Sequence, residues 1–228
     1  MKKKALILII IILILTGCGK EKEEENTLKQ DLVILEQLSN GEITKGVLES
    51  YKFSETDEVT DRIKIQMTDG RVILAVLSNQ DTPITIANFK NLVAQHFYDG
   101  LIFHRVIEGF MIQTGDPTGI GTSGSGQMIK GEFSLNGVPN RLSHTRGVLS
   151  MGRRGGNPET AETMNSASSH FFIMHQDNPN IDGYYAAFGK VFAGMDAVDS
   201  IATTETGTND RPIQEQKILS IRFINIEK

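Results

Sequence analysis

The chain has 228 residues, of which 39% are hydrophobic and 22% are charged, and its formal net charge is −5. This composition is typical of a globular protein that is long enough to bury its own core, and it excludes a mainly disordered chain. An acidic balance without a concentrated basic patch argues against nucleic acid as a partner. No repeat with a period of about 20–50 residues is present, which excludes repeat architectures.

The first 18 residues have the features of an export signal. A basic start (MKKK) precedes an unbroken apolar run over residues 5–15, which is shorter than the roughly 20 residues that span a bilayer. The residues LTGC follow and end in Cys18, the only cysteine. They resemble the lipobox of bacterial lipoproteins, which implies a signal peptide of residues 1–17 and a lipid on Cys18. An uncleaved signal anchor is the alternative interpretation.

This interpretation places the protein outside the cytoplasm, anchored to the bacterial cell membrane through its lipid alone. Cleavage would remove three of the 23 basic residues, so the mature net charge would be −8 against 28 acidic residues. Residues 18–60 are expected to form a charged tether and then a short amphipathic helix with leucines at positions 28, 32, 35 and 38. Whether that helix packs on the main domain or binds a partner stays open.

From residue 61 onward, short apolar strands alternate with turns. Residues 61–77 predict a β-hairpin around Asp69-Gly70. Further strands are expected over residues 101–107, 110–116, 147–152, 170–176, 186–192 and 217–228. Many short strands of this kind favour an antiparallel sheet that closes on itself.

Two helices are expected between these strands. The first covers residues 82–97, because Thr82 suits the cap position and Pro83 suits the first turn. The second covers residues 194–204. Together with the strands, they predict a mainly β fold, a closed antiparallel barrel capped by two α-helices.

Two sequence patterns point to chemistry that their surroundings do not support. Gly119, Gly121 and Gly124 fit the dinucleotide pattern G-x-G-x-x-G, but no helical period follows, so we interpret them as a loop at the rim of a site. The five histidines show no metal-binding spacing, and we expect no metal or other cofactor. The serines before His170 lack a G-x-S-x-G elbow, which makes a hydrolase a weak alternative.

The apolar stretch FHRVIEGFMIQTGD, residues 103–116, contains a permanent charge. Arg105 cannot lose its proton, so burying it costs free energy unless it has a partner or a task. Alternation along a strand places Arg105 on one face with Phe103. After the turn, Met111 and Gln113 also share a face.

These residues supply one cationic donor, one amide and an apolar wall, without a nucleophile or an acid–base pair. Such a set suits a reaction that breaks no bond, and rotation about the peptide bond before proline is one such reaction. A donor to the proline nitrogen would favour the twisted state, in which amide resonance is lost. A structural ion pair would explain Arg105 equally well.

Five stretches together resemble the cyclophilins, which are peptidyl-prolyl cis–trans isomerases. They are FHRVIEGFMIQTGDPTGIGTSG, KGEF, HTRGVLSMG, NSASSHFFIM and IDGYYAAFGKV, in the family's order. The resemblance covers residues 61–228 and implies an eight-stranded antiparallel β-barrel capped by two α-helices. It also implies an isomerase that acts on proline-containing segments of unfolded or exported proteins without a cofactor. We expect it to assist folding at the cell surface as a monomer.

The resemblance also assigns site residues. Arg105 matches the catalytic arginine, and Gln113 matches the glutamine that orients it and the substrate backbone. The positions expected to bind substrate are Phe110, Met111, Gly121, Gly152, His170, Phe172, Ile181 and Tyr185. We interpret His104 as a structural strand residue.

The chain departs from the family's pattern at three places. His170 stands where glutamine is common, so we expect activity to decrease at acidic pH. Asn180 stands where many members have tryptophan, which implies weak inhibition by cyclosporin. Residues 152–164 are longer than usual, and Arg153 and Arg154 either favour acidic residues near proline or are solvated loop charges. A proline-peptide binding module with little turnover is therefore the alternative to an enzyme.

Overall fold

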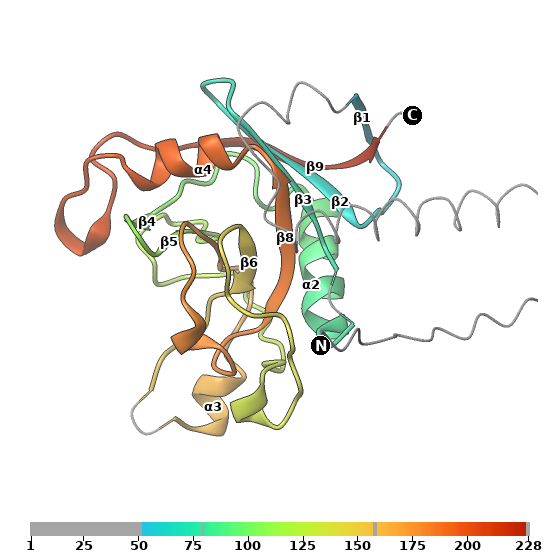
Figure 1. Cartoon of the computed structure of the whole chain (residues 1–228), viewed down its shortest axis with the longest axis vertical. Coiled ribbons are helices and arrows are strands. Elements are labelled where there is room, and N and C mark those ends of the chain that lie inside the picture. The colour runs from blue at the N-terminus through green and yellow to red at the C-terminus, as the bar shows by residue number, and fades with distance from the viewer. Residues whose placement is uncertain (1–51, 79, 157–158, 227–228) are drawn as a thin grey trace, which may run out of the picture. The chain divides into compact units, whose positions relative to one another are not determined.

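The computed structural model describes residues 52–78, 80–156 and 159–226. One antiparallel sheet dominates this part of the chain (Figure 1). Its strands are β1 (Phe53–Thr56), β2 (Arg62–Met67), β3 (Val72–Val76), β4 (Arg105–Ile107), β5 (Met111–Thr114), β6 (Val148–Met151), β7 (Phe171–Met174), β8 (Ala187–Ala193) and β9 (Ile218–Ile226). The helices are α2 (Pro83–Ala94), α3 (Ala161–Met164) and α4 (Met195–Ala202), with 3-10 turns η2 (Ser134–Asn136), η3 (Pro179–Ile181) and η4 (Thr208–Asp210). The predicted signal peptide, Cys18 and the leucine-containing helix lie outside the described residues.

Backbone hydrogen bonds join the β4 end of the sheet to β9. The strand order is β1-β9-β2-β3-β8-β6-β7-β5-β4. Just before β4, Gly100 N donates to Ile218 O (3.0 Å) and Phe103 N donates to Gln216 O (2.9 Å), while Ile218 N donates to Leu101 O (2.8 Å). Strands β2–β9 therefore form the mainly β, eight-stranded antiparallel barrel predicted from the sequence. These bonds, and not a ladder between β4 and β9, complete its ring.

Strand β1 is an additional strand of the sheet that lies outside the predicted eight-stranded barrel. It pairs with β9, with Phe53 opposite Ile226 and Thr56 opposite Phe223. It precedes residue 61, where we placed the start of the barrel domain. Its sequence, FSET, has a single large apolar residue, and alternation over four residues is too short to predict a strand.

Helix α2 begins at the predicted position but is capped by a residue from elsewhere in the chain. Pro83 occupies its first turn and Thr82 is the cap residue, yet the Thr82 side chain makes no capping hydrogen bond. Instead, the buried carboxylate of Glu132 accepts from Ile84 N (3.0 Å) and Thr85 N (2.7 Å). A carboxylate there pairs two free N–H groups and complements the helix dipole.

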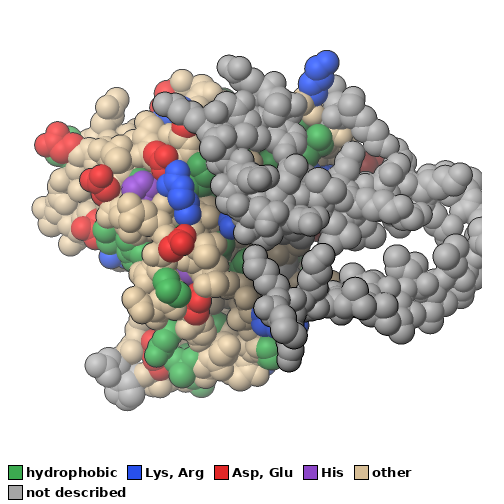
Figure 2. Space-filling model, viewed as in Figure 1, with side chains coloured by type: hydrophobic (Ala, Val, Ile, Leu, Met, Phe, Trp, Pro, Cys, Tyr) green, Lys and Arg blue, Asp and Glu red, His purple; other side chains and the backbone are tan. Residues whose placement is uncertain are grey.

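The second predicted helix corresponds to α4. A third, short helix, α3, lies within the stretch of residues 152–164 that is longer than usual for the family. α3 was not predicted; it has four residues and is capped by reciprocal hydrogen bonds between Thr160 and Thr163. Acidic side chains are scattered over the region of α4 and the loop after it (Figure 2). No helix among the described residues is long and apolar enough to cross a bilayer.

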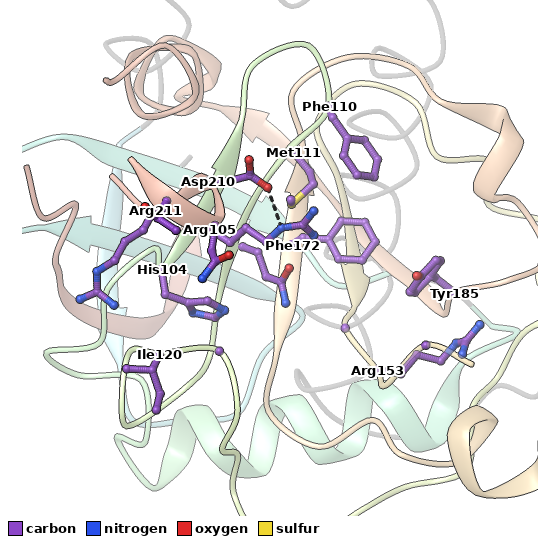
Figure 3. Close-up of a pocket in the computed structure, with 16 residues that line it drawn as sticks. His104, Arg105, Phe110, Met111, Ile120, Arg153, Phe172, Tyr185, Asp210 and Arg211 are labelled. Atoms are coloured by element: carbon purple, nitrogen blue, oxygen red, sulfur yellow. Dashed lines mark hydrogen bonds and ion pairs between the residues drawn. The ribbon is translucent and has the colours of Figure 1, made fainter. Parts of the chain in front are cut away.

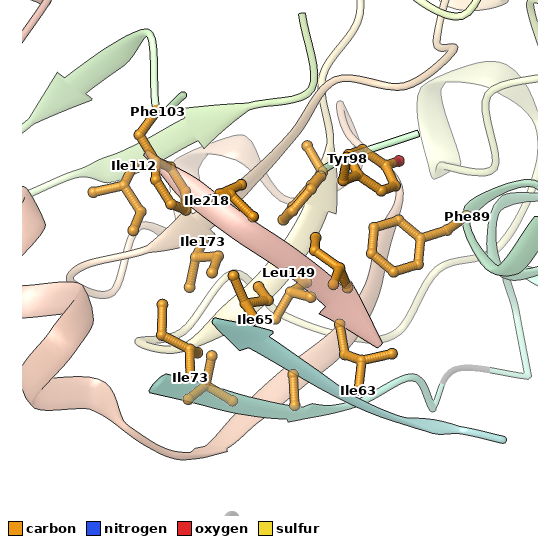
Figure 4. Close-up of a cluster of buried hydrophobic side chains, with 14 of the residues drawn as sticks. Ile63, Ile65, Ile73, Phe89, Tyr98, Phe103, Ile112, Leu149, Ile173 and Ile218 are labelled. Atoms are coloured by element: carbon orange, nitrogen blue, oxygen red, sulfur yellow. The ribbon is translucent and has the colours of Figure 1, made fainter. Parts of the chain in front are cut away.

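Apolar side chains fill the barrel interior (Figure 4). Ile63, Ile112 and Ile173 are fully buried there, and the ring of Phe89 from α2 lies 5.2 Å from that of Phe171. Because side chains alternate along a strand, the neighbours of these residues project from the opposite face. A second apolar cluster, which includes Met111, therefore forms on the outer face of the barrel.

Candidate active site

A cavity of about 820 Å³ opens on that outer face (Figure 3). Eight of the ten residues predicted for the site line it, namely Arg105, Phe110, Met111, Gln113, Gly121, Gly152, Phe172 and Tyr185. Ile181 is not among its lining residues but packs against the cluster of Met111 and Phe172. His170 lines a neighbouring cavity of about 280 Å³, which Gln113 also lines.

Neighbouring strands bring the polar and apolar parts of the cavity together. Gln113 lies opposite Arg105 in the β4–β5 pair and opposite Phe172 in the β5–β7 pair. Residues directly opposite each other in antiparallel strands project from the same face, so all three side chains reach the cavity. The turn between β4 and β5 contains Gly109, whose φ of 77° favours glycine.

Three side chains form the apolar floor and wall of the cavity. Met111 is 2% exposed and Phe172 is 5% exposed, so both are almost completely covered by other parts of the protein. The ring of Tyr185 meets that of Phe172 edge to face, with their centroids 5.6 Å apart. A small apolar ring of proline size would have suitable contacts here.

A buried polar network supports this floor from behind. His144 stacks on Phe172 with ring centroids 6.2 Å apart, its Nδ1 lies 2.7 Å from Asp182 Oδ1, and its Nε2 lies 2.9 Å from Ser150 Oγ. Burial lowers the pKa of His144, although Asp182 acts in the opposite direction. Serine, histidine and aspartate are the members of a hydrolytic triad, but Ser150 is fully buried and no substrate can reach it. The network is therefore structural.

The Arg105 guanidinium has an acidic partner that the sequence analysis missed. Its Nε donates to Oδ2 of Asp210 at 3.2 Å. Asp210 belongs to η4, which lines the cavity together with Ile120. The signal in the sequence was the turn-forming run TGTNDRP, residues 206–212, but nothing in it indicates which residue it faces.

Gln113 points towards His170. Its Nε2 lies 3.5 Å from Nδ1 of His170, whose Nε2 is hydrogen-bonded to the carbonyl of Ser123. His104 lies beneath this pair, with its ring centroid 5.1 Å from that of His170. Burial, followed by the effect of His170, lowers the pKa of His104 to about 4. His104, which lies just before β4 and lines the cavity, is thus neutral near pH 7.

The two arginines of the insertion differ in accessibility. The Arg153 side chain is 2% exposed, and both of its terminal nitrogens lie 2.9 Å from the carboxylate of Glu159. Its guanidinium also lies 5.0 Å from the ring centroid of Phe133 and 4.9 Å from that of Tyr185. Arg153 is therefore a packing residue and unavailable to an acidic substrate. Arg154 is 53% exposed.

The glycine-rich loop is organised around one carboxylate of the protein itself. Asp116 is buried, and its oxygens accept from Thr118 N (2.7 Å) and Thr122 N (2.8 Å). Burial alone would raise the pKa of Asp116, but the hydrogen bond from the Thr118 hydroxyl, together with those from backbone N–H groups of the loop, outweighs it and lowers the pKa. The backbone N–H groups that a phosphate would need are thus already paired, which agrees with a rim loop. Gly121, with a φ of 88°, approaches the ring of His104.

Comparison with known proteins identifies this architecture. A family model described as cyclophilin type peptidyl-prolyl cis-trans isomerase/CLD matches residues 62–223. The chain belongs to the cyclophilin family. A Gibberella zeae protein named peptidyl-prolyl cis-trans isomerase-like 1 is 37% identical to this cyclophilin over 171 residues, which cover 75% of this chain and 99% of that protein. An Arabidopsis thaliana peptidyl-prolyl cis-trans isomerase is 40% identical over 139 residues, 60% of this chain and 81% of that protein.

Solved structures lead to the same family. The crystal structure of a Cryptosporidium parvum cyclophilin type peptidyl-prolyl cis-trans isomerase superposes with a TM-score of 0.63 at 31% identity, over 74% of this chain and 98% of that chain. A second structure of that protein, obtained in the presence of the dipeptide Ala-Pro, gives a TM-score of 0.62 at 30% identity, over 73% of this chain and 99% of that chain. This cyclophilin is thus a peptidyl-prolyl isomerase with a barrel fold, as predicted.

The individual roles of the site residues stay predictions. The structure brings eight of them to one cavity. The relatives named above come from fungal, plant and protozoan sources and do not bear on an N-terminal lipid.

Proposed function

We propose that Arg105 of this cyclophilin catalyses rotation about the peptide bond before proline. The barrier to this rotation, roughly 18–20 kcal/mol, comes from amide resonance. As the bond twists, the lone pair of the proline nitrogen localises and becomes a better hydrogen-bond acceptor. A guanidinium N–H directed at that nitrogen therefore stabilises the twisted state more than either planar state, which is the requirement for catalysis.

One observation carries this proposal: an accessible cation lies beside a covered apolar floor. The Arg105 side chain is 43% exposed at the cavity, whereas the floor of Met111 and Phe172 is almost completely buried. Phe110, Met111 and Phe172 would hold the proline ring while the preceding carbonyl rotates, and the amide of Gln113 would bind the substrate backbone. The Ala-Pro dipeptide named for the Cryptosporidium parvum relative supports a proline-containing substrate.

The test is NMR exchange between the cis and trans forms of an Ala-Pro peptide in the presence of the full-length protein. We expect accelerated exchange that is lost in Arg105→Ala. Arg141→Ala is the matched control, because Arg141 is 80% exposed and does not line the cavity. Equal acceleration by all three proteins would contradict the role of Arg105.

The same experiment separates an enzyme from a binding module. The position of His170 beside Gln113 is the observation that favours a module, since the glutamine that should serve the substrate is 3.5 Å from an imidazole nitrogen. Peptide chemical shifts that move on binding, without accelerated exchange in any variant, would identify a protein that holds proline segments with little turnover.

We further propose that the isomerase acts on exported proteins from a lipid anchor on Cys18. The support is in the sequence alone: a basic start, a short apolar run and the residues LTGC. Slow isomerisation at proline limits the folding of many chains, and exported chains fold away from the cytoplasmic isomerases. Because the cyclophilin fold and this segment are independent features, either proposal can fail without the other.

Metabolic labelling with an alkyne-tagged palmitate tests the anchor. The full-length protein should be labelled, partition into a detergent phase and lose residues 1–17, as measured by mass spectrometry. Cys18→Ser should remain unlabelled and unprocessed. An unlabelled, full-length wild-type protein in the detergent phase would instead identify an uncleaved signal anchor.

A further inference from the structure

The acidic partner of Arg105 comes from the other end of the domain. Asp210 is 105 positions away in the sequence, and its Oδ2 accepts from Arg105 Nε at 3.2 Å (Figure 3). The two side chains are 43% and 45% exposed, so water screens the pair and its effect on stability is small. A hydrogen bond in this position still fixes the orientation of the guanidinium group, because it restricts rotation about the last bonds of the Arg105 side chain.

The loop that carries Asp210 is held in an unfavourable backbone conformation. Asn209 and Asp210 have φ values of 61° and 57°, in the left-handed region that residues other than glycine rarely adopt. Hydrogen bonds hold the loop in place: the Arg211 guanidinium donates to the carbonyl of Gly119 in the glycine-rich loop, and Gly207 N donates to Arg211 O (2.8 Å). Such conformations persist where the surroundings impose them, often at functional sites.

The family resemblance assigns Gln113 to orienting Arg105, but the Gln113 side chain points towards His170 instead. Its side-chain nitrogen lies near His170, and His170 is itself bonded to the carbonyl of Ser123. In the part of the chain that the structure describes, the side-chain hydrogen bond found for Arg105 is the one to Asp210. The orienting contact has thus moved from a neighbouring strand to a distant loop.

We propose that Asp210 is a positioning residue for catalysis. Its carboxylate binds Nε of Arg105 and fixes the plane of the guanidinium. The N–H groups of both terminal nitrogens then stay available for the twisted peptide. The inference rests on the proposed role of Arg105. Without Asp210 the guanidinium would sample several orientations, so kcat should decrease more than the affinity for substrate.

The experiment compares Asp210→Ala and Asp210→Asn with Asp196→Asn in the full-length protein. Asp196 lies on α4 and does not line the cavity, so its variant removes one charge without touching Arg105. The measurements are kcat and KM for an Ala-Pro peptide, and the ¹⁵N NMR signal of the Arg105 Nε–H group. Because small misplacements of catalytic groups have large effects, we expect kcat of Asp210→Ala to fall roughly tenfold, with KM within about twofold.

The Nε–H signal should shift and broaden in Asp210→Ala. Asp210→Asn should recover part of both properties, because its amide oxygen can still accept the bond, and Asp196→Asn should match the wild type. Wild-type kcat in Asp210→Ala would overturn the inference. So would a decreased kcat with an unchanged Nε–H signal, since the guanidinium would not have moved.

Arg105→Ala distinguishes failure of this inference from failure of the proposed function. If Arg105→Ala is fully active, the role of Arg105 is wrong and the inference falls with it. If Arg105→Ala is inactive while both Asp210 variants are fully active, only the role of Asp210 is wrong. The near-isosteric Asp210→Asn keeps the test valid if Asp210→Ala fails to fold.

Discussion

The guanidinium of Arg153 lies 4.9 Å from the ring centroid of Tyr185. Tyr185 in turn packs edge to face on Phe172, at the floor of the cavity. Arg153, held by Glu159, therefore packs on the wall of the cavity through one buried side chain.

Replacing Arg153 should affect both stability and substrate binding. Arg153→Met leaves Glu159 without its cationic partner and removes the cation from the faces of two rings, so the free energy of unfolding should fall by about 2 kcal/mol. KM for a proline peptide should rise severalfold as Tyr185 becomes mobile. Arg154→Met is the matched control, because Arg154 is half exposed. Denaturant unfolding and peptide kinetics test the pair, and equal effects of the two variants would contradict the prediction.

His104 should make the protein less stable in acid. Its pKa is lowered to about 4 in the folded state and is about 6.5 in an unfolded chain, so the unfolded state binds more protons between these values. The free energy of unfolding should therefore fall as the pH falls from about 6.5 to 4, by about 3 kcal/mol from this group. Urea unfolding of the wild type and of His104→Gln over this range isolates the effect, and parallel pH profiles would refute it.

His170 should influence where the Gln113 amide points. Nε2 of Gln113 lies 3.5 Å from Nδ1 of His170, whose Nε2 is hydrogen-bonded to the carbonyl of Ser123. In His170→Ala the Gln113 amide loses this neighbour and is free to bind a substrate backbone, so KM for an Ala-Pro peptide should decrease severalfold. Steady-state kinetics of the variant test this, and an unchanged KM would contradict it.

Glu132 should stabilise α2 without affecting catalysis. Glu132→Gln keeps the shape of the side chain but removes the charge that accepts from Ile84 N and Thr85 N. We expect the free energy of unfolding to fall by about 1–2 kcal/mol with kcat unchanged. Glu162→Gln, at a carboxylate that is 78% exposed, should lose much less. Chemical denaturation decides between a helix cap and an incidental contact.

Local signals in the sequence predicted the elements of the fold well. Alternating apolar and polar residues around Asp69-Gly70 indicated the first hairpin, and Pro83 marked the start of α2. Both features depend on residues close together in the chain. The family resemblance then supplied the strand count and the residues of the cavity. The four-residue strand β1 was missed because its pattern is too short.

The contacts that orient side chains could not be predicted in this way. Glu132 caps a helix that begins 49 residues earlier, and Asp210 faces Arg105 across 105 residues. Such pairs form only when the barrel brings distant loops together, and no local pattern records them. Arg153 illustrates the same limit, since a charged residue in a glycine-rich loop gave no sign of being buried between two rings.

Gly155 offers a practical use of the insertion. It lines the cavity, yet a side chain added at this position would meet no other atom within 4 Å. At Gly152, in contrast, an added Cβ would lie 3.0 Å from that of His170. A cysteine at position 155 could therefore carry a fluorescent dye at the cavity mouth, with Cys18 as the only natural thiol to replace. The binding and release of unlabelled substrate proteins could then be followed by the change in fluorescence.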